Sequence, residues 1–503
     1  MAYEKRTGTM SAYFVEQLVK RNEPVMQFFL LPFMAPVSYI CDGREASDVM
    51  THRIKEFDRS RLFGDLFVAY MPHSSITFPT DNDWKYNRSL ISETMLPRFL
   101  EASGAKQAYG AFKELVSLWQ EKARLADDRA IDVAGDTRMA AMDAIWAMTF
   151  GSSIDTCKTA AAYFSKTPGL EPPTESSTPQ LANLPSYPHP PIFESLMTLL
   201  HSSRIAMSVG HRAHWLAMSV LPSLRKAKKI RDKLVRERLS QTYARFASKT
   251  NGSKVAEKGV ASAIDIAVQR EITVAAKEGR LALNAKATEG IHNELCLFLA
   301  AGSAITADTI SWGLKRLTAH QDVQAVLRAE TIEKFQSFDM NGVPPIAEAI
   351  ATTDLPQLDA FIEEVLRCHP LGNSNNAGPS LLSIPFPISD QNRSPTSLKS
   401  TSSKWDHHSD LETFRPDRWL IQDSSGSKHV KFDPSAYPMQ TFGEGPRSCF
   451  GKKFAYLEMR IALTLILWNF ELLPIPEELV DFDIVEELTR NARHVRLRLK
   501  RIS

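Results

Sequence analysis

The segment FGEGPRSCFG, residues 442–451, combines the residue types that a thiolate metal ligand requires. Cys449 stands just before an apolar, helix-forming run that begins at Lys452. The start of a helix offers free backbone amides and the positive end of the helix dipole, so a cysteine at this junction can be held as a thiolate. Gly445 and Gly451 permit sharp turns and close approach to a flat ligand. Taken alone, Cys449 would more simply be an ordinary buried cysteine, but the surrounding pattern favours a metal ligand.

This segment resembles the cysteine loop of the cytochromes P450, and every fixed position of the FxxGxRxCxG signature is matched. The matching residues are Phe442, Gly445, Arg447, Cys449 and Gly451. The resemblance implies that Cys449 is the axial ligand of the iron of haem b. It also implies that Arg447 pairs with a haem propionate, and that Phe442 packs over the sulfur and keeps water away.

A second resemblance lies upstream, in FIEEVLRCHP and FRPDRW. Glu364 and Arg367 match the ExxR pair of the same family, and a spacing of three places both on one helical face. Arg418 matches the arginine that completes the triad. The family implies that the triad holds the core around the cysteine loop, and the alternative is a surface salt bridge of little energetic value.

A third resemblance is the WxxxR pattern in DWKYNR. Trp84 and Arg88 are four residues apart and share a helical face. An indole N–H and a permanent cation suit a carboxylate partner, and the resemblance implies contacts with the haem propionates. The alternative is a half-buried tryptophan beside a solvated arginine.

The run NELCLFLAAGSAITADTISWGLKRL resembles the long helix that crosses the oxygen side of the haem. Ala301 and Gly302 match the small pair that opens the oxygen pocket. Relatives then carry an acid followed by a threonine, where this chain has Ala304 and Ile305. Neither side chain can relay a proton, so this is a real departure from the family pattern.

Other groups could take over the proton relay. Thr306 and Ser303 are the nearest candidates, beside a water chain or a substrate hydroxyl. Asp308 and Thr309 repeat the acid–threonine order one turn later. Helical threonines most often bond their own backbone, and Asp308 is more simply a solvated or packed polar residue.

The elements that position these residues are mainly helices, with a minor β-sheet. Residues 26–40 contain strands that prolines punctuate, as at a sheet edge. Apolar residues recur at helical spacing in four segments, Ala108 to Ala126, Met139 to Phe150, Ala206 to Lys249 and Ile291 to His320.

Two segments, 167–191 and 372–403, are rich in proline and serine and are expected to be irregular loops. Relatives usually have a strand and a hairpin in the second segment. Neither is recognisable here, and Arg393 is too isolated to assign. We therefore expect one cytochrome P450 domain over residues 1–503, with a shortened sheet after the ExxR helix.

Composition describes a soluble globular chain, with 503 residues of which 43% are hydrophobic and 23% charged. The net charge of +2 gives no indication of nucleic-acid binding. Five scattered cysteines favour a reducing compartment. The apolar stretch 25–40 is too short and too interrupted to span a membrane, and no signal peptide is visible. The chain as written is expected to be cytoplasmic, or at the endoplasmic reticulum surface if a longer isoform carries the family's anchor.

The resemblance implies a monooxygenase that uses dioxygen and reductase-supplied electrons on a hydrophobic small molecule. The phrases KEFDRS, MDAIWAMTFG and LTLILWNFELLP are similar to enzymes of filamentous-fungal secondary metabolism, so a terpenoid, polyketide or alkaloid is expected. Two alternatives remain open, namely a haem enzyme with an altered oxygen route, such as peroxide use or rearrangement, and a degenerate non-catalytic haem protein.

Electrons must come from outside, because no flavin or nicotinamide fingerprint is present. The family implies NADPH–cytochrome P450 reductase, a flavoprotein. Lys452 and Lys453 could help it dock, although plain surface lysines are as good an explanation. The basic run 224–239 could touch a membrane surface, but a solvated helix face is the simpler interpretation. No stable oligomer is expected.

Overall fold

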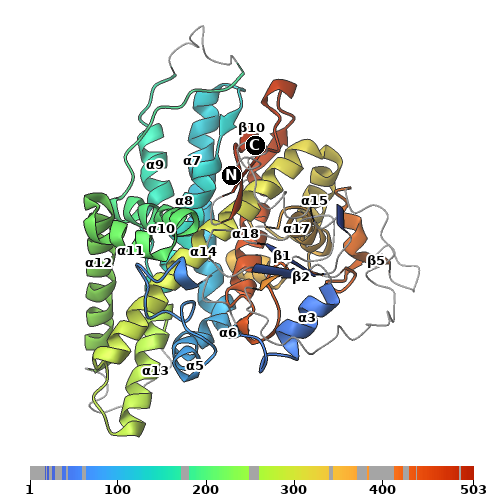
Figure 1. Ribbon diagram of the computed structural model, residues 1–503. Helices are drawn as coiled ribbons and strands as arrows, with labels where there is room; N and C mark the ends of the chain where they lie inside the picture. Colours follow the sequence, from blue (N-terminus) through green and yellow to red (C-terminus); the bar gives the residue numbers. More distant parts are fainter. Residues whose placement is uncertain are drawn as a thin grey trace. The chain divides into compact units, whose positions relative to one another are not determined.

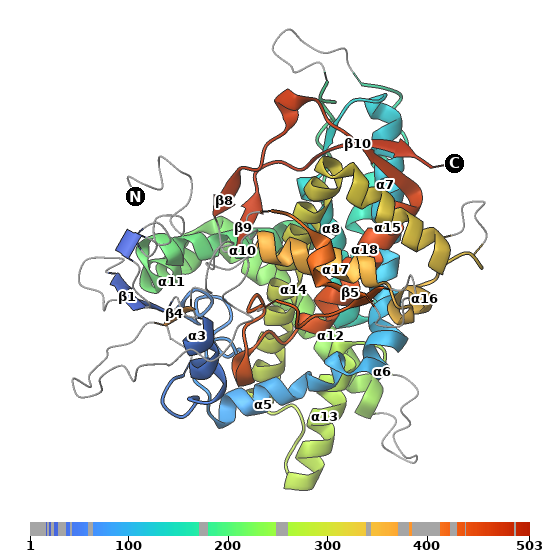
Figure 2. The same ribbon diagram turned by 90° about the vertical axis from the view of Figure 1, so that its right-hand side faces the viewer.

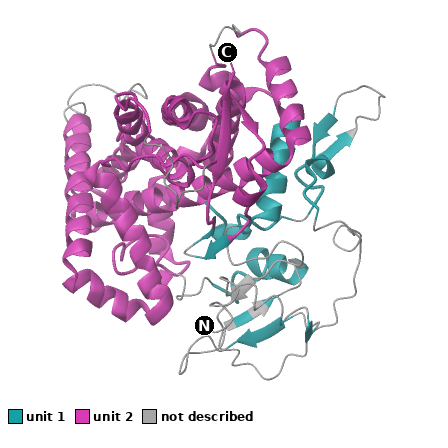
Figure 3. Cartoon of the chain, turned by 90° about the horizontal axis from the view of Figure 1, so that it is seen from above, with its two compact units in different colours: residues 1–62, 355–450, 484–491 teal, residues 63–354, 451–483, 492–503 magenta. Residues whose placement is uncertain are grey.

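The computed structural model describes residues 17, 20–21, 25–28, 37–40, 43–58, 64–170, 180–247, 260–338, 344–370, 382–384, 413–422, 430–437, 439–486 and 489–502. The chain divides into two compact units, which Figure 3 colours separately. Unit 1 comprises residues 1–62, 355–450 and 484–491, and unit 2 comprises the remainder. Each unit is described by itself.

Unit 2 contains a helical layer in which three helices pack side by side (Figure 1). These are α7 (Ala105–Ala126), α8 (Ala134–Phe150) and α9 (Thr156–Phe164). Helix α8 is buried on almost every side, which fits its run of alanines, methionines and aromatic residues. A helix that is apolar all round belongs in the centre of a large core.

The long central helix is α14 (Ala285–Ala319), which packs against α8, α12, α13 and α18. It begins two turns before the predicted segment because the Asn284 side chain caps it by accepting a hydrogen bond from the Ala287 N–H. Among the described helices, α14 alone is long and apolar enough to cross a membrane, yet most of its apolar window is buried inside the protein.

The single helix expected over residues 206–249 is wrong, because the structure has three helices there. They are the end of α10 (Pro191–Val209), then α11 (His211–Val220) and α12 (Pro222–Ala247). Gly210 has a φ of 91°, which ends α10, and Pro222 starts α12 where its missing N–H costs nothing.

Further elements complete unit 2, and Figure 2 shows α5 beside α13. A small antiparallel sheet has the strand order β3-β10-β7. The elements are α5 (Asn82–Leu90), α13 (Ala263–Glu278), α15 (Gln321–Lys334), α16 (Ala347–Thr352), α18 (Lys452–Asn469), β3 (Ile131–Asp132), β7 (Phe470–Leu473) and β10 (Arg496–Arg501), with short turns at Ser92–Met95, Pro97–Phe99, Leu100–Gly104 and Glu477–Leu479.

Unit 1 holds α3 (Gly43–Thr51), α17 (Pro356–Cys368) and short strands. The first sheet, β1-β2-β4, is antiparallel and includes the strands predicted within residues 26–40. Its strands are β1 (Val25–Phe28), β2 (Val37–Ile40) and β4 (Leu382–Ile384). The other elements are the turn η3 (Pro416–Trp419), the hairpin of β5 (Leu420–Gln422) and β6 (Val430–Phe432), and the turn η4 (Gly445–Arg447); β8 (Ile484–Glu486) pairs with β9 (Arg490–Ala492).

The two segments expected to be irregular differ in outcome. Strand β4 lies inside 372–403, so the expectation of an irregular loop is wrong at residues 382–384, which pair with β2. The rest of that segment, including Arg393, lies outside the described residues. In 167–191, the described residues up to Pro190 hold one isolated bridge, from Ala130 to Leu181.

Candidate active site

The cysteine loop is closed by its own backbone. The Cys449 N–H donates to the Phe442 carbonyl oxygen over 2.8 Å, and the Ser448 N–H donates to the Gly445 carbonyl oxygen over 3.1 Å. These bonds fold residues 442–449 into a compact turn. Phe442 and Arg447 are half-buried on this turn.

Gly445 is where this turn meets α3. Its φ is +67°, which disfavours any side chain, and an added Cβ would overlap the carbonyl oxygen of Met50. The neighbouring Glu444 carboxylate accepts a hydrogen bond from the Ser47 hydroxyl on the same helix. The motif glycine is therefore required by contact with α3 as well as by backbone conformation.

Cys449 is exposed, whereas Cys157, Cys296 and Cys368 are buried. Burial raises the pKa of the Cys157 thiol well above its usual range and that of Cys296 to about 11. Since the thiolate is the metal-binding form, neither thiol is poised to ligate at neutral pH without a metal to displace its proton. Among the described cysteines, Cys449 alone has the accessibility that a ligand to a bound cofactor requires.

The acid Glu364 of α17 is the centre of a buried cluster. Glu364 is fully buried and accepts hydrogen bonds from Arg367 Nε at 2.8 Å and Nη2 at 2.9 Å. Arg418 Nε reaches the same carboxylate at 3.1 Å. The structure thus brings together all three residues expected to form the triad, and they form a buried network rather than a surface pair.

Two further donors to Glu364 were missed by sequence reasoning. The Arg415 N–H donates over 2.7 Å, and the indole N–H of Trp419 donates over 3.0 Å. Tyr437 lies against this cluster, with its ring centroid 5.0 Å from the guanidinium carbon of Arg418 and 5.3 Å from the Trp419 ring. Trp419 directly follows Arg418 in FRPDRW, and a buried indole N–H needs a hydrogen-bond acceptor. The sequence could therefore have indicated that Trp419 also contacts the triad.

Trp84 and Arg88 lie on the same face of α5, and both are half-buried. The helix begins at Asp81, whose carboxylate accepts the Trp84 N–H over 2.9 Å. Between them, Asn87 faces α14 and donates to Glu294 over 3.2 Å. The structure thus places Trp84 and Arg88 about one turn apart on α5, next to the contact between α5 and α14.

Glu294 fixes α5 to α14 and was not singled out from the sequence. Its buried carboxylate accepts hydrogen bonds from the Ser75 N–H and from the Ser75 hydroxyl, the latter over 3.0 Å. Burial raises the pKa of Glu294 to about 7, and the bonds from Ser75 and Asn87 oppose the shift only in part.

The middle of α14 has an open apolar face. Ala301 and Ile305, one turn apart, are exposed within a helix that is otherwise mostly buried. Gly302 is turned toward α8, where an added Cβ would lie 2.6 Å from Cγ1 of Ile145. The two small residues therefore have different roles. Ala301 leaves room on the exposed face of α14, whereas Gly302 permits close packing against α8.

Most of the candidate proton-relay groups on α14 already make hydrogen bonds or ion pairs within the protein. Ser303 donates its hydroxyl to the Leu299 carbonyl oxygen over 3.1 Å, and Thr309 donates to the Ile305 carbonyl oxygen over the same distance. Asp308 is buried and pairs with Arg138 at 3.4 Å. The acid–threonine order one turn later therefore does not offer a second relay.

Thr306 is also buried, and it lies toward Glu458 of α18. Burial raises the pKa of Glu458 well above its usual range, and the Thr306 hydroxyl opposes this effect in part. Neither carboxyl oxygen makes a hydrogen bond of normal geometry. Burial thus favours the protonated form of Glu458, a group that the sequence patterns did not point out.

Several features suit a haem. Cys449 offers an exposed sulfur, and the exposed pair Ala301 and Ile305 offers an apolar surface. A Cβ added at Gly451 would meet no atom within 4 Å, which leaves open space beside this glycine. The residue types needed for a thiolate ligand, an apolar face and propionate contacts are all present, so the chain fits the group.

This helical fold and cysteine loop define a haem-thiolate protein. The family model for cytochrome P450 matches residues 2–493, and the chain belongs to that family. It is 30% identical to "Cytochrome P450 monooxygenase GME11363" of Pestalotiopsis microspora, covering 99% of this chain and 90% of that protein. It is 28% identical to "Cytochrome P450 monooxygenase TRI13" of Fusarium sporotrichioides, covering 97% and 90%.

A solved structure, "Crystal structure of a Cytochrome P450 (CYP102L1)", has a TM-score of 0.67 and 18% identity, covering 98% of this chain and 95% of that one. It shows the fold. The predictions of a mainly helical cytochrome P450 fold and of a monooxygenase are thus confirmed.

Proposed function

We propose that the protein is a haem-thiolate monooxygenase that binds haem b through Cys449 and oxidises a hydrophobic small molecule in fungal secondary metabolism. The bound haem would supply reductive activation of dioxygen and transfer of one oxygen atom to the substrate. Trp84, Arg88 and Arg447 would hold its propionates, and Phe442 would shield the sulfur. Ala301 and Ile305 would line the oxygen side. The similar proteins from Pestalotiopsis, Fusarium and Penicillium are all named cytochrome P450 monooxygenases, which supports the reaction class.

The observation that carries the proposal is the closed loop in which Cys449 donates its N–H to Phe442 and remains exposed. A cysteine with a packing role would be buried, as Cys157 and Cys368 are. Here the backbone is fixed while the sulfur stays accessible, which is what a ligand needs.

The test is the ferrous carbon-monoxide difference spectrum of the purified, haem-reconstituted chain. We expect the red-shifted Soret band of a thiolate-ligated haem, lost in Cys449→Ala and retained in Cys157→Ala. Haem uptake with an unchanged band in Cys449→Ala would contradict the assignment. Failure of the parent chain to take up haem would favour the degenerate alternative.

The electron donor would be NADPH–cytochrome P450 reductase, a flavoprotein. Lys452 and Lys453 are exposed at the start of α18 and would attract an acidic docking face. We expect Lys452→Glu/Lys453→Glu to raise the KM for reductase while leaving peroxide-supported turnover unchanged. An equal loss in both assays would assign the lysines a structural role instead.

The occupied relay groups favour a second candidate, a haem enzyme with an altered oxygen route. The hydroxyl groups of Ser303 and Thr309 donate hydrogen bonds to backbone carbonyl oxygens, and Asp308 pairs with Arg138. Ile305 stands at the position where relatives carry threonine. Proton delivery would then depend on water or on a substrate hydroxyl, or peroxide would serve as the oxidant.

Reinstating the missing pair separates the two candidates. If oxygen activation is limited by proton delivery, Ala304→Asp/Ile305→Thr raises product formed per NADPH by about tenfold or more, within the range of general acid–base effects. Peroxide-supported turnover should not change. Efficient NADPH-driven turnover by the parent, with no gain in the variant, would remove the second candidate.

A further inference from the structure

A cluster of metal-ligating side chains lies in unit 2, apart from the cysteine loop. Asp232 is on α12, and His292 and Cys296 are four residues apart on α14, which places both on one helical face. One ligand atom from each residue lies within 4.8 Å of the other two. Thiolate, imidazole and carboxylate are the ligands that zinc takes in proteins.

His292 has no structural explanation of its own. It is 3% exposed, and neither ring nitrogen makes a hydrogen bond. The nearest acceptor is Asp232 Oδ1, at 3.5 Å from Nε2, which is longer than a normal hydrogen bond. This long contact with Asp232 satisfies the buried imidazole poorly, which is costly, so the ring has capacity for a further ligand.

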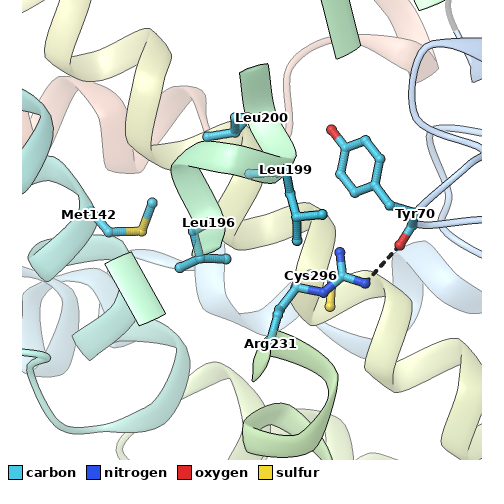
Figure 4. A pocket seen from close by; sticks show the side chains of 8 residues that line it. Tyr70, Met142, Leu196, Leu199, Leu200, Arg231 and Cys296 are labelled. Carbon is cyan, nitrogen blue, oxygen red and sulfur yellow. Dashed lines mark hydrogen bonds between the residues drawn. The ribbon is translucent and has the colours of Figure 1, made fainter. Parts of the chain in front are cut away.

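Arg231 lies next to the cluster. It belongs to the basic run 224–239, for which a solvated helix face was the simpler interpretation. It is instead buried, and it binds Asp232 Oδ1 through Nε at 2.8 Å and Nη2 at 2.6 Å. It also donates to the Tyr70 carbonyl oxygen over 2.9 Å, as Figure 4 shows. Although burial acts to raise it, His292 and Arg231 lower the pKa of Asp232 to about 2. The carboxylate is therefore ionised and held in place from one side, as outer partners hold a metal ligand.

The net charge of the cluster stays small when a divalent ion is bound. Asp232 and Arg231 cancel, the imidazole is neutral as a ligand, and Cys296 would lose its proton to the solvent on binding. A divalent ion with one thiolate then adds a single positive charge. Tyr70 lies beside Arg231, with its ring centroid 5.8 Å from the guanidinium carbon, and offers its aromatic face to that guanidinium group.

We propose that Asp232, His292 and Cys296 form a binding site for a thiophilic divalent cation such as zinc, which joins α12 to α14. Ligands of a tetrahedral zinc lie about 3.3–3.8 Å apart, so the three side chains need to close by roughly 1 Å. Three protein ligands leave a fourth position. Cys296 also lines a small cavity with Arg231 and Tyr70 (Figure 4), and a solvent molecule would complete the tetrahedral set.

Zinc retention by the purified full chain tests the site. The protein is incubated with zinc chloride, desalted and analysed for zinc per chain, alongside Cys296→Ala, His292→Asn and the matched control Cys157→Ala. We expect one zinc per chain in the parent and control, and at least tenfold weaker binding in the two site variants. Equal retention by all four proteins, or none by the parent, would overturn the proposal.

Cadmium gives a readout that does not require the site variants Cys296→Ala and His292→Asn to fold. Added to the parent chain, it should produce the ultraviolet charge-transfer absorption of a cadmium–thiolate bond, and this absorption should persist in Cys449→Ala and in Cys157→Ala. Its absence from the parent, or its loss in Cys449→Ala alone, would show that Cys296 is not a ligand. Neither result depends on monooxygenase activity.

Discussion

The indole N–H of Trp419 donates to Glu364 Oε2 over 3.0 Å, in the same cluster where Arg418 reaches Oε1. The carboxylate therefore accepts from Arg367, Arg418, Trp419 and the backbone of Arg415. Two guanidinium groups depend on this one acid, so Glu364 of α17 holds Arg418 and Trp419 of η3 in one network.

Removing the charge of Glu364 should destabilise the protein strongly. Glu364→Gln leaves the buried Arg418 and the partly buried Arg367 without this counter-charge, and breaking such a network costs about 3–5 kcal/mol. The control Glu348→Gln breaks an exposed pair with Lys106, which should cost about 0–1 kcal/mol. Denaturant unfolding measures both. A small effect in Glu364→Gln would mean that the network contributes little to stability.

Gly445 and Gly451 should respond differently to alanine. Gly445→Ala forces a side chain into a φ of +67° and against the Met50 carbonyl group, at a cost of about 2–5 kcal/mol. Gly451→Ala meets open space, so the haem-free chain should keep its stability while haem binding weakens. Thermal unfolding of the haem-free chain and haem titration separate the two effects. Equal loss of stability in both variants would contradict this division.

Glu294 should make stability depend on pH. Its folded-state pKa, about 7, exceeds the unfolded value of 4.5, so the folded state holds a proton that the unfolded state releases. The contribution is complete below pH 4.5 and disappears as the pH rises through 7, a change of about 3 kcal/mol. The free energy of unfolding should therefore fall between pH 5 and 8 more steeply in the parent than in Glu294→Gln. Parallel profiles would refute the shift.

Gly302 should be required for contact between α14 and α8. The Cβ of Gly302→Ala would lie 2.6–2.7 Å from Cγ1 and Cδ1 of the buried Ile145 side chain, an overpacking that costs about 1–3 kcal/mol. Gly110→Ala, on an open face of α7, should stabilise by up to about 1 kcal/mol. Adding Ile145→Ala to Gly302→Ala should cost less than Ile145→Ala alone, as a double-mutant cycle of unfolding free energies can show. Additive effects would mean that the two side chains do not meet.

The sequence by itself determined the family and the local arrangement of its motifs. FGEGPRSCFG, the ExxR spacing and the long apolar run of α14 carry their chemistry over a few neighbouring residues. Such patterns can be interpreted without knowledge of the fold. Residues three or four apart on a helix, or within one turn, are neighbours in space whatever surrounds them.

Tertiary structure alone decided which groups meet across the chain. The pairing of β4 with β2, the hydrogen bond from Trp419 to Glu364, and the raised pKa values of Glu294 and Glu458 depend on residues far apart in sequence. The cluster of Asp232, His292 and Cys296 depends on the packing of α12 against α14. Burial sets these pKa values and contacts, and burial is a property of the packed chain that no single segment contains.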